Sequence, residues 1–121
     1  MCRRDRSSDI SVEGEGGYME FIVHLQVNWP SDGDPTELVR LTEAEHERAV
    51  ELAAAGILKR LWRIPGRRAN WGLWEAPSPT ELHAALTSLP FFPWLDAEVH
   101  AVGAHPNDPA GWATTTEDSD R

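Results

Sequence analysis

The stretch ILKRLWRIPGRRANWGLWE, residues 57–75, decides the fold, because it predicts two β-strands joined by a tight turn. Branched and aromatic side chains, which favour strands, are concentrated in residues 57–64 and 69–75. Between them, Pro65-Gly66 suits a turn in which the glycine has a positive φ. The predicted hairpin lies at the centre of the regular part of the chain.

The register of the hairpin decides which side chains share a face of the sheet. In simple register around the turn, Arg63 lies opposite Arg68. Leu61 and Asn70 then form the next pair on the same face. Residues of the other parity, Trp62 among them, are expected to point to the opposite face.

The chain before the hairpin predicts a strand followed by a helix. Apolar side chains alternate with mostly polar ones over residues 21–27, which is the period of a strand with one apolar face. Asp34, Pro35 and Glu37 then form a helix-capping pattern. The helix is expected to end at Gly56.

The chain after the hairpin repeats this plan in the order helix, then strand. Ser78, Pro79 and Glu81 form a second capping pattern, and a stripe of leucines follows until Pro90. A last strand is expected over residues 95–102. The order strand, helix, strand, strand, helix, strand predicts a ferredoxin-like α+β fold, a four-stranded antiparallel sheet with both helices on one face.

The two ends of the chain lack hydrophobic periodicity. Residues 1–18 and 107–121 are rich in charged and small polar side chains, so we expect a disordered N-terminal arm and a disordered acidic tail. One domain, residues 19–106, lies between them. Its regular pattern begins at Met19, which is therefore an alternative start of translation.

Composition excludes several classes of partner. The net charge of −9 over 121 residues disfavours binding to nucleic acid, and no apolar run is long enough to span a membrane. Cys2 is the only cysteine and cannot form an internal disulfide, in keeping with a cytoplasmic protein. The histidines show no metal-ligand spacing, so we expect no metal.

Six tryptophans are many for a chain of this length. The hairpin strands carry large apolar side chains at both parities: Leu61, Trp62, Trp71 and Trp74. A domain of about 88 residues buries only part of its surface alone, so we expect the sheet face away from the helices to pack against a second subunit. The alternative is that exposed tryptophans are scattered singly over the surface.

One carboxylate breaks the pattern of the first helix. Glu45 falls within the apolar stripe that includes Leu41 and Leu52, whereas Glu43 and Glu47 lie opposite this stripe. A buried carboxylate acquires either a raised pKa or a partner of opposite charge. Glu45 is therefore either suited to act as a general base or forms a buried salt bridge with an arginine of the hairpin, and both remain open.

A short basic segment stands out in this acidic chain. Five of the 11 basic residues lie within ten positions: Lys59, Arg60, Arg63, Arg67 and Arg68. A local basic patch on an acidic protein suggests a small anionic ligand. Alternatively, at least two of these residues are edge-strand charges that discourage aggregation.

Three stretches of the chain resemble the muconolactone Δ-isomerase family. They are LWRIPGRRAN at 61–70, SPTELHAALTSLPFFPW at 78–94 and HP at 105–106, beside family patterns close to HLWR, AGxYAN, LPLFPY and HPS. The similarity runs without a gap from about Phe21 to Pro106. It implies a ferredoxin-like dimeric α+β barrel. It also implies a homo-oligomer, because members of the family assemble dimers into larger rings.

The resemblance also implies an activity, a cofactor-free 1,3 proton shift in an anionic butenolide during aromatic catabolism by the β-ketoadipate pathway. Such an enzyme needs a base, donors for a developing oxyanion and a cation for the substrate carboxylate. The glutamate that the resemblance links to proton transfer aligns with Glu45. Arg63 and Asn70 match family positions, and we assign Arg63 to the substrate carboxylate and Asn70 to the oxyanion. Trp62 also matches, and core packing is its alternative role.

The chain departs from the family pattern at three positions. Arg60 stands where the family has histidine, Arg68 where it has tyrosine and Gly72 where it has serine. Arginine cannot release a proton at working pH, so Arg60 and Arg68 are candidate substrate-binding residues of a changed pocket. The exact lactone therefore stays open, and the alternatives are a chloromuconolactone dehalogenase-like lyase and a non-catalytic barrel that binds an acidic or aromatic metabolite.

Overall fold

The computed structural model of the chain describes residues 18–110. The predicted arm, apart from its last residue, and residues 111–121 of the predicted tail lie outside the described residues. The elements follow in the order β1 (Met19–Val27), α1 (Pro35–Ala54), β2 (Leu58–Arg63), β3 (Ala69–Ala76), α2 (Pro79–Thr87), a 3₁₀ turn (Phe92–Trp94) and β4 (Leu95–Val102). This is the predicted order, and the elements form one antiparallel sheet in the strand order β2-β3-β1-β4.

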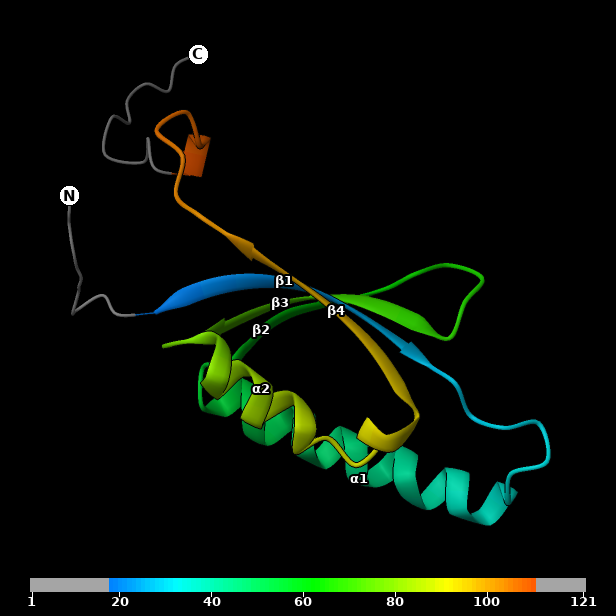
Figure 1. Cartoon of the computed structure of the whole chain (residues 1–121). Coiled ribbons are helices and arrows are strands. Elements are labelled where there is room, and N and C mark those ends of the chain that lie inside the picture. Colours follow the sequence, from blue (N-terminus) through cyan, green and yellow to red (C-terminus); the bar gives the residue numbers. More distant parts are fainter. Residues whose placement is uncertain (1–17, 111–121) are drawn as a thin grey trace.

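Both helices lie on one face of the sheet, as expected for the ferredoxin-like α+β fold (Figure 1). The core lies between this face and the helices, and its largest fully buried side chains are Phe21, Val23, Leu52, Trp74 and Leu82. Burying one such side chain contributes about 1.5–3 kcal/mol. Within residues 18–110, no element covers the opposite face of the sheet, which is called the open face below.

The predicted caps start both helices. The Asp34 carboxylate accepts a hydrogen bond from the Thr36 backbone N–H at 3.0 Å, and the Ser78 hydroxyl accepts one from the Glu81 N–H at 3.3 Å. After α1, Gly56 adopts a positive φ of 80°, which ends the helical path where the sequence predicts it. In the part of the chain that the structure describes, neither helix is long and apolar enough to cross a membrane.

The turn of the hairpin has the predicted chemistry. The Arg67 N–H donates to the Ile64 carbonyl oxygen at 3.2 Å, and Gly66 has a φ of 80°. These are features of a type II turn with proline and glycine at its centre.

The predicted register of the hairpin is wrong by two residues. Arg63 pairs with Asn70 and not with Arg68, and the strands are joined by the four residues 65–68. The reason is that a type II turn does not match the twist of the two strands, so they pair only beyond the turn. Because the shift is even, Leu61 still shares a face with Arg63 and Asn70.

Gly72 leaves room for the largest side chain of the core. A Cβ atom at this position would lie 2.5 Å from the indole Nε1 and 3.1 Å from the Cδ1 of Trp74. Trp74 is only 1% exposed and is held between the sheet and the helices, so it has little space to move.

We expect Gly72→Ala to lower the free energy of unfolding by about 1–3 kcal/mol, because the added methyl group overpacks the core beside Trp74. Urea denaturation followed by tryptophan fluorescence measures this change. Gly103→Ala is the matched control, since no atom lies within 4 Å of its added Cβ. Equal stability of the two variants would contradict the expectation.

Candidate active site

The basic hairpin and helix α1 border an open cavity of 310 Å³ on the helical side of the sheet. Its lining residues come from β1, α1, the hairpin and the segment after α2: Val27, Leu38, Thr42, Arg63, Arg68, Ala69, Asn70 and Phe91. Two further hollows adjoin it through shared residues. One, of 250 Å³, includes Arg63 and Asn70, and the other, of 510 Å³, includes Arg68 and Leu38.

The polar groups of this cavity are available to a ligand. Arg63 and Arg68 form no ion pair with any described residue, and no acidic side chain lines the cavity. The Asn70 Oδ1 atom is buried and, among residues 18–110, accepts no hydrogen bond. Leaving such a group unsatisfied is costly, so this atom is free to bond to a ligand or to water. The two ends of the amide are nearly equal in shape, so a flip would put the Nδ2 donor in this place.

Glu45 lies at the Phe91 end of the cavity. Its Oε1 atom accepts a hydrogen bond from the Phe91 backbone N–H at 3.0 Å, and Phe91 lines the cavity. Glu45 itself is not a lining residue and lies about one helical turn beyond Thr42, which is one.

The carboxylate of Glu45 is half-buried. Burial raises its pKa above the ordinary value, and the hydrogen bond from Phe91 opposes part of this rise. In the described chain Glu45 forms no ion pair with an arginine, so the structure has no salt bridge of the kind that the sequence left open. The result is a carboxylate without a counter-charge and with a raised pKa, and such a group is suited to proton transfer.

Aromatic packing holds Phe91 in place. Its ring makes edge-on contacts with Trp29 and Trp94 at centroid distances of 6.3 and 6.5 Å. The Phe92 and Trp94 N–H groups close a short turn on the carbonyl oxygens of Leu89 and Phe91. The backbone N–H that binds Glu45 therefore belongs to a well-packed turn.

The sequence did not single out five residues of the cavity wall as candidates: Val27, Leu38, Thr42, Ala69 and Phe91. Phe91 lies in a segment that served as the end of a helical stripe and as part of the family resemblance, but not as part of a site. The available signal was the stretch LPFFPW, in which two prolines flank two aromatic residues. Such a stretch is typical of a rigid turn that presents backbone groups at fixed positions.

The predicted substrate-binding residues are divided between the two faces of the sheet. Arg63, Arg68 and Asn70 share the cavity. Arg60 and Trp62 point to the open face, as predicted, where the Arg60 guanidinium lies 4.9 Å from the Trp62 ring centroid. Within one chain the sheet therefore separates these two residues from the cavity.

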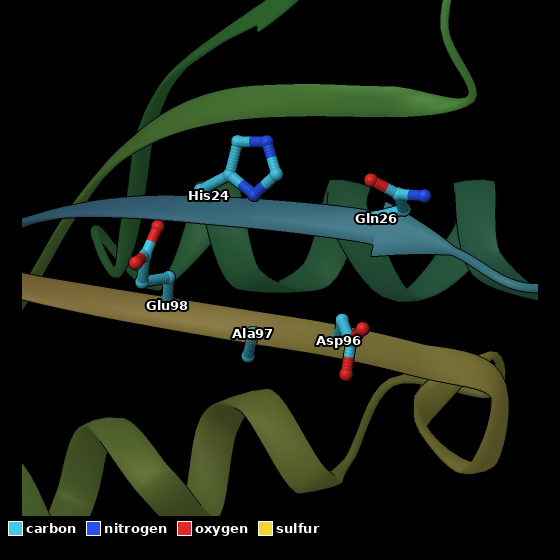
Figure 2. A pocket seen from close by; sticks show the side chains of 5 residues that line it. All are labelled: His24, Gln26, Asp96, Ala97 and Glu98. Atoms are coloured by element: carbon cyan, nitrogen blue, oxygen red, sulfur yellow. The ribbon is translucent and has the colours of Figure 1, made fainter.

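A second hollow of 290 Å³ lies between β1 and β4. Figure 2 shows its side chains, His24 and Gln26 on β1 and Asp96, Ala97 and Glu98 on β4. The His24 ring contacts Trp71 edge-on at 5.0 Å. This hollow contains no buried polar atom that lacks a hydrogen bond, in contrast to the cavity at Asn70. Residues 18–110 also contain no cluster of three His, Cys, Asp or Glu side chains that could hold a metal ion.

Comparison with known proteins gives one consistent answer. Residues 19–108 match the description of the muconolactone delta-isomerase family. The chain belongs to this family. It is 42% identical over 89 residues to the muconolactone delta-isomerase of Pseudomonas aeruginosa, covering 74% of this chain and 93% of that protein. It is 39% identical over 103 residues to muconolactone delta-isomerase 2 of Acinetobacter lwoffii, covering 85% and 100%.

The fold is also that of this family. A crystal structure of muconolactone isomerase superimposes with a TM-score of 0.71 at 39% sequence identity, covering 74% of this chain and 94% of that chain. The resemblance stated from sequence motifs and the ferredoxin-like α+β fold are both confirmed.

Glu45→Gln tests whether ionisation of this carboxylate destabilises the fold. Because its pKa is raised in the folded chain, the folded state binds more protons than the unfolded state between the two pKa values. The stability contributed by the protonated carboxyl is thus present at acid pH and lost as pH rises through the folded pKa. Glutamine keeps an acceptor for the Phe91 N–H but cannot ionise. We therefore expect the free energy of unfolding of Glu45→Gln, minus that of wild type, to be larger at about pH 7 than at about pH 4.

Urea denaturation at the two pH values measures this difference. Glu47→Gln, on the exposed face of the same helix, is the matched control and should show no such trend. The same stability difference between Glu45→Gln and wild type at both pH values would argue against a raised pKa.

Proposed function

We propose that this protein is an intramolecular isomerase that moves a carbon–carbon double bond in an anionic butenolide, as the name of its relatives states for muconolactone. The observation that carries this proposal is the half-buried Glu45 carboxylate without a counter-charge, held beside a cavity with unpaired arginines. The reaction needs no cofactor, because a base and a stabilised oxyanion suffice for a proton shift next to a carbonyl group.

In the proposed reaction, Glu45 removes a proton from a ring carbon of the lactone. The electron pair of that C–H bond enters the ring, the double bond moves, and negative charge develops on the lactone carbonyl oxygen. The protonated Glu45 then returns the proton to another ring carbon, so no atom is gained or lost. Its Oε1 atom is occupied by the Phe91 N–H, which leaves Oε2 to carry the proton.

Arg63 and Asn70 supply the other two requirements. The exposed Arg63 guanidinium suits the carboxylate arm of the substrate, since this pairing allows two parallel hydrogen bonds. The amide of Asn70, next to Arg63 in the cavity, suits the lactone oxygen where charge develops when the amide is flipped so that its Nδ2 group donates to that oxygen.

Glu45→Gln should lower kcat by about 10² to 10⁴, because glutamine cannot accept the proton, while binding of muconolactone is preserved. In wild type, kcat/KM should fall on the acid side with an apparent pKa above the ordinary value for glutamate, because only the carboxylate acts as base. The rate of the ultraviolet absorption change that accompanies isomerisation measures both effects.

Glu47→Gln serves as the control and should keep wild-type turnover. Wild-type turnover by Glu45→Gln would remove Glu45 from the mechanism. If wild type binds muconolactone and related butenolides but isomerises none of them, the protein is a binding module and not an enzyme.

We also propose that the open face pairs with the open face of a second copy, in a dimer that can assemble further into a ring. On this face the register aligns Trp62, Trp71, His24 and Glu98 in one row across the four strands. Trp62 and Trp71 are 42% and 40% exposed, a large apolar area for a monomer to leave uncovered.

Charge supports this pairing. The β2 edge of the open face carries Arg60, and the β4 edge carries Asp96 and Glu98. A two-fold axis between two such faces can bring the basic edge of one copy to the acidic edge of the other, and such complementarity fixes orientation.

Light scattering should therefore give a mass of at least twice 13.5 kDa at micromolar concentration. Trp71→Glu should shift the protein towards monomer, because it places a charge in the centre of the buried face. Val39→Glu, at an exposed apolar position of α1, is the control and should leave the dimer intact. A monomeric mass for wild type would rule out the pairing.

A further inference from the structure

Arg63 and Arg68 line the same cavity but border different neighbouring hollows. Both line the central 310 Å³ cavity, but each also lines a different neighbouring hollow. Arg63 extends into the hollow formed with Leu61 and Asn70. Arg68 extends into the hollow that includes Trp29. A ligand that fills the central cavity therefore meets one guanidinium towards the sheet and another towards the Trp29 loop.

The two guanidinium groups are not balanced by the protein. No acidic side chain lines the central cavity or the two adjoining hollows. Neither Arg63 nor Arg68 has an ion pair within residues 18–110, although three other basic residues of the chain do, namely Arg40, Arg48 and Lys59. Both side chains are exposed and line open hollows, so their guanidinium groups are free to pair with a ligand that carries two anionic groups.

The number of cations exceeds what a monoanionic lactone requires. One guanidinium forms a bidentate pair with one carboxylate, and Arg63 fills this role in the proposed reaction. The lactone oxygen is served by Asn70, which lies next to Arg63. Arg68, which borders the other hollow, is then left without a negative group to bind.

We propose that Arg68 binds a second carboxylate, and that the preferred substrate is a dianionic butenolide with acidic groups on opposite sides of the ring. This inference rests on the proposed isomerase function of the same cavity. It makes Arg68 the residue that determines specificity, whereas Arg63 binds the carboxylate that all such lactones share.

Two probes test the proposal: muconolactone, which carries one carboxylate, and a butenolide with the same acetate arm and a further carboxylate on the ring. Binding is measured by isothermal titration to Glu45→Gln, in which turnover is suppressed. We expect the dianion to bind at least about tenfold more tightly than muconolactone. Adding Arg68→Gln should abolish this preference and change the affinity for muconolactone by less than about twofold.

Three further variants complete the design. Arg67→Gln removes a neighbouring arginine that lines none of the three hollows, so it should keep the preference. Arg63→Gln should weaken both ligands, and Arg68→Lys should keep part of the preference because it keeps the charge. Arg68 substitutions leave in place the 2.8 Å hydrogen bond from the Val27 N–H to the residue 68 carbonyl oxygen, so the fold should be retained.

The proposal is overturned if the dianion is not preferred, if Arg68→Gln weakens both ligands equally, or if Arg67→Gln has the same effect as Arg68→Gln. Turnover of both lactones by the protein with Glu45 intact is measured separately. A dianion preference without turnover of either lactone would refute the isomerase function and support the role of Arg68. Turnover of muconolactone without a dianion preference would refute only the role of Arg68.

Discussion

The hydrogen bond from the Phe91 N–H to Glu45 is the contact on which the arrangement of the cavity depends. It joins α1, in the first βα unit, to the turn that follows α2 in the second. Without it, a carboxylate in the apolar stripe of α1 would be half-buried with no hydrogen-bond partner in the described chain, which is unfavourable because burial disfavours the charged form. The Phe91 N–H is neutral, so it satisfies the Glu45 carboxylate without balancing its charge, and the pKa of Glu45 remains raised. An arginine partner would balance the charge and lower this pKa.

The charge distribution follows from the same arrangement. The chain carries a net charge of −9, yet the hairpin end that faces the cavity presents Arg63 and Arg68 with no acidic neighbour among the lining residues. An overall negative protein repels polyanions, and salt screens this repulsion beyond about 8–10 Å. A small anion that reaches the cavity meets the local positive charge. A positive cavity on a negative protein therefore favours a small acidic ligand over a large one.

The sequence predicted the strands, both caps and the faces of the hairpin, because each depends on a local pattern. The pairing of Arg63 with Asn70 was not predictable from strand periodicity, since it depends on how the turn is closed by the Arg67 N–H. Periodicity showed that Glu45 is unusual, but its partner is a backbone N–H 46 residues away. Side-chain charges are visible in a sequence and backbone donors are not, and for that reason an arginine was considered as the partner.

The two arginines that depart from the family pattern have different consequences, because the sheet lies between them. Arg68 lies in the hairpin loop and lines the cavity, so it changes the groups that a ligand in the cavity meets. Arg60 lies on the open face, over the Trp62 ring, and cannot reach that cavity within its own chain. In the dimer that we propose, the positive charge of Arg60 lies in the subunit contact. We therefore infer that the arginine at position 68 bears on substrate choice and the one at position 60 on assembly.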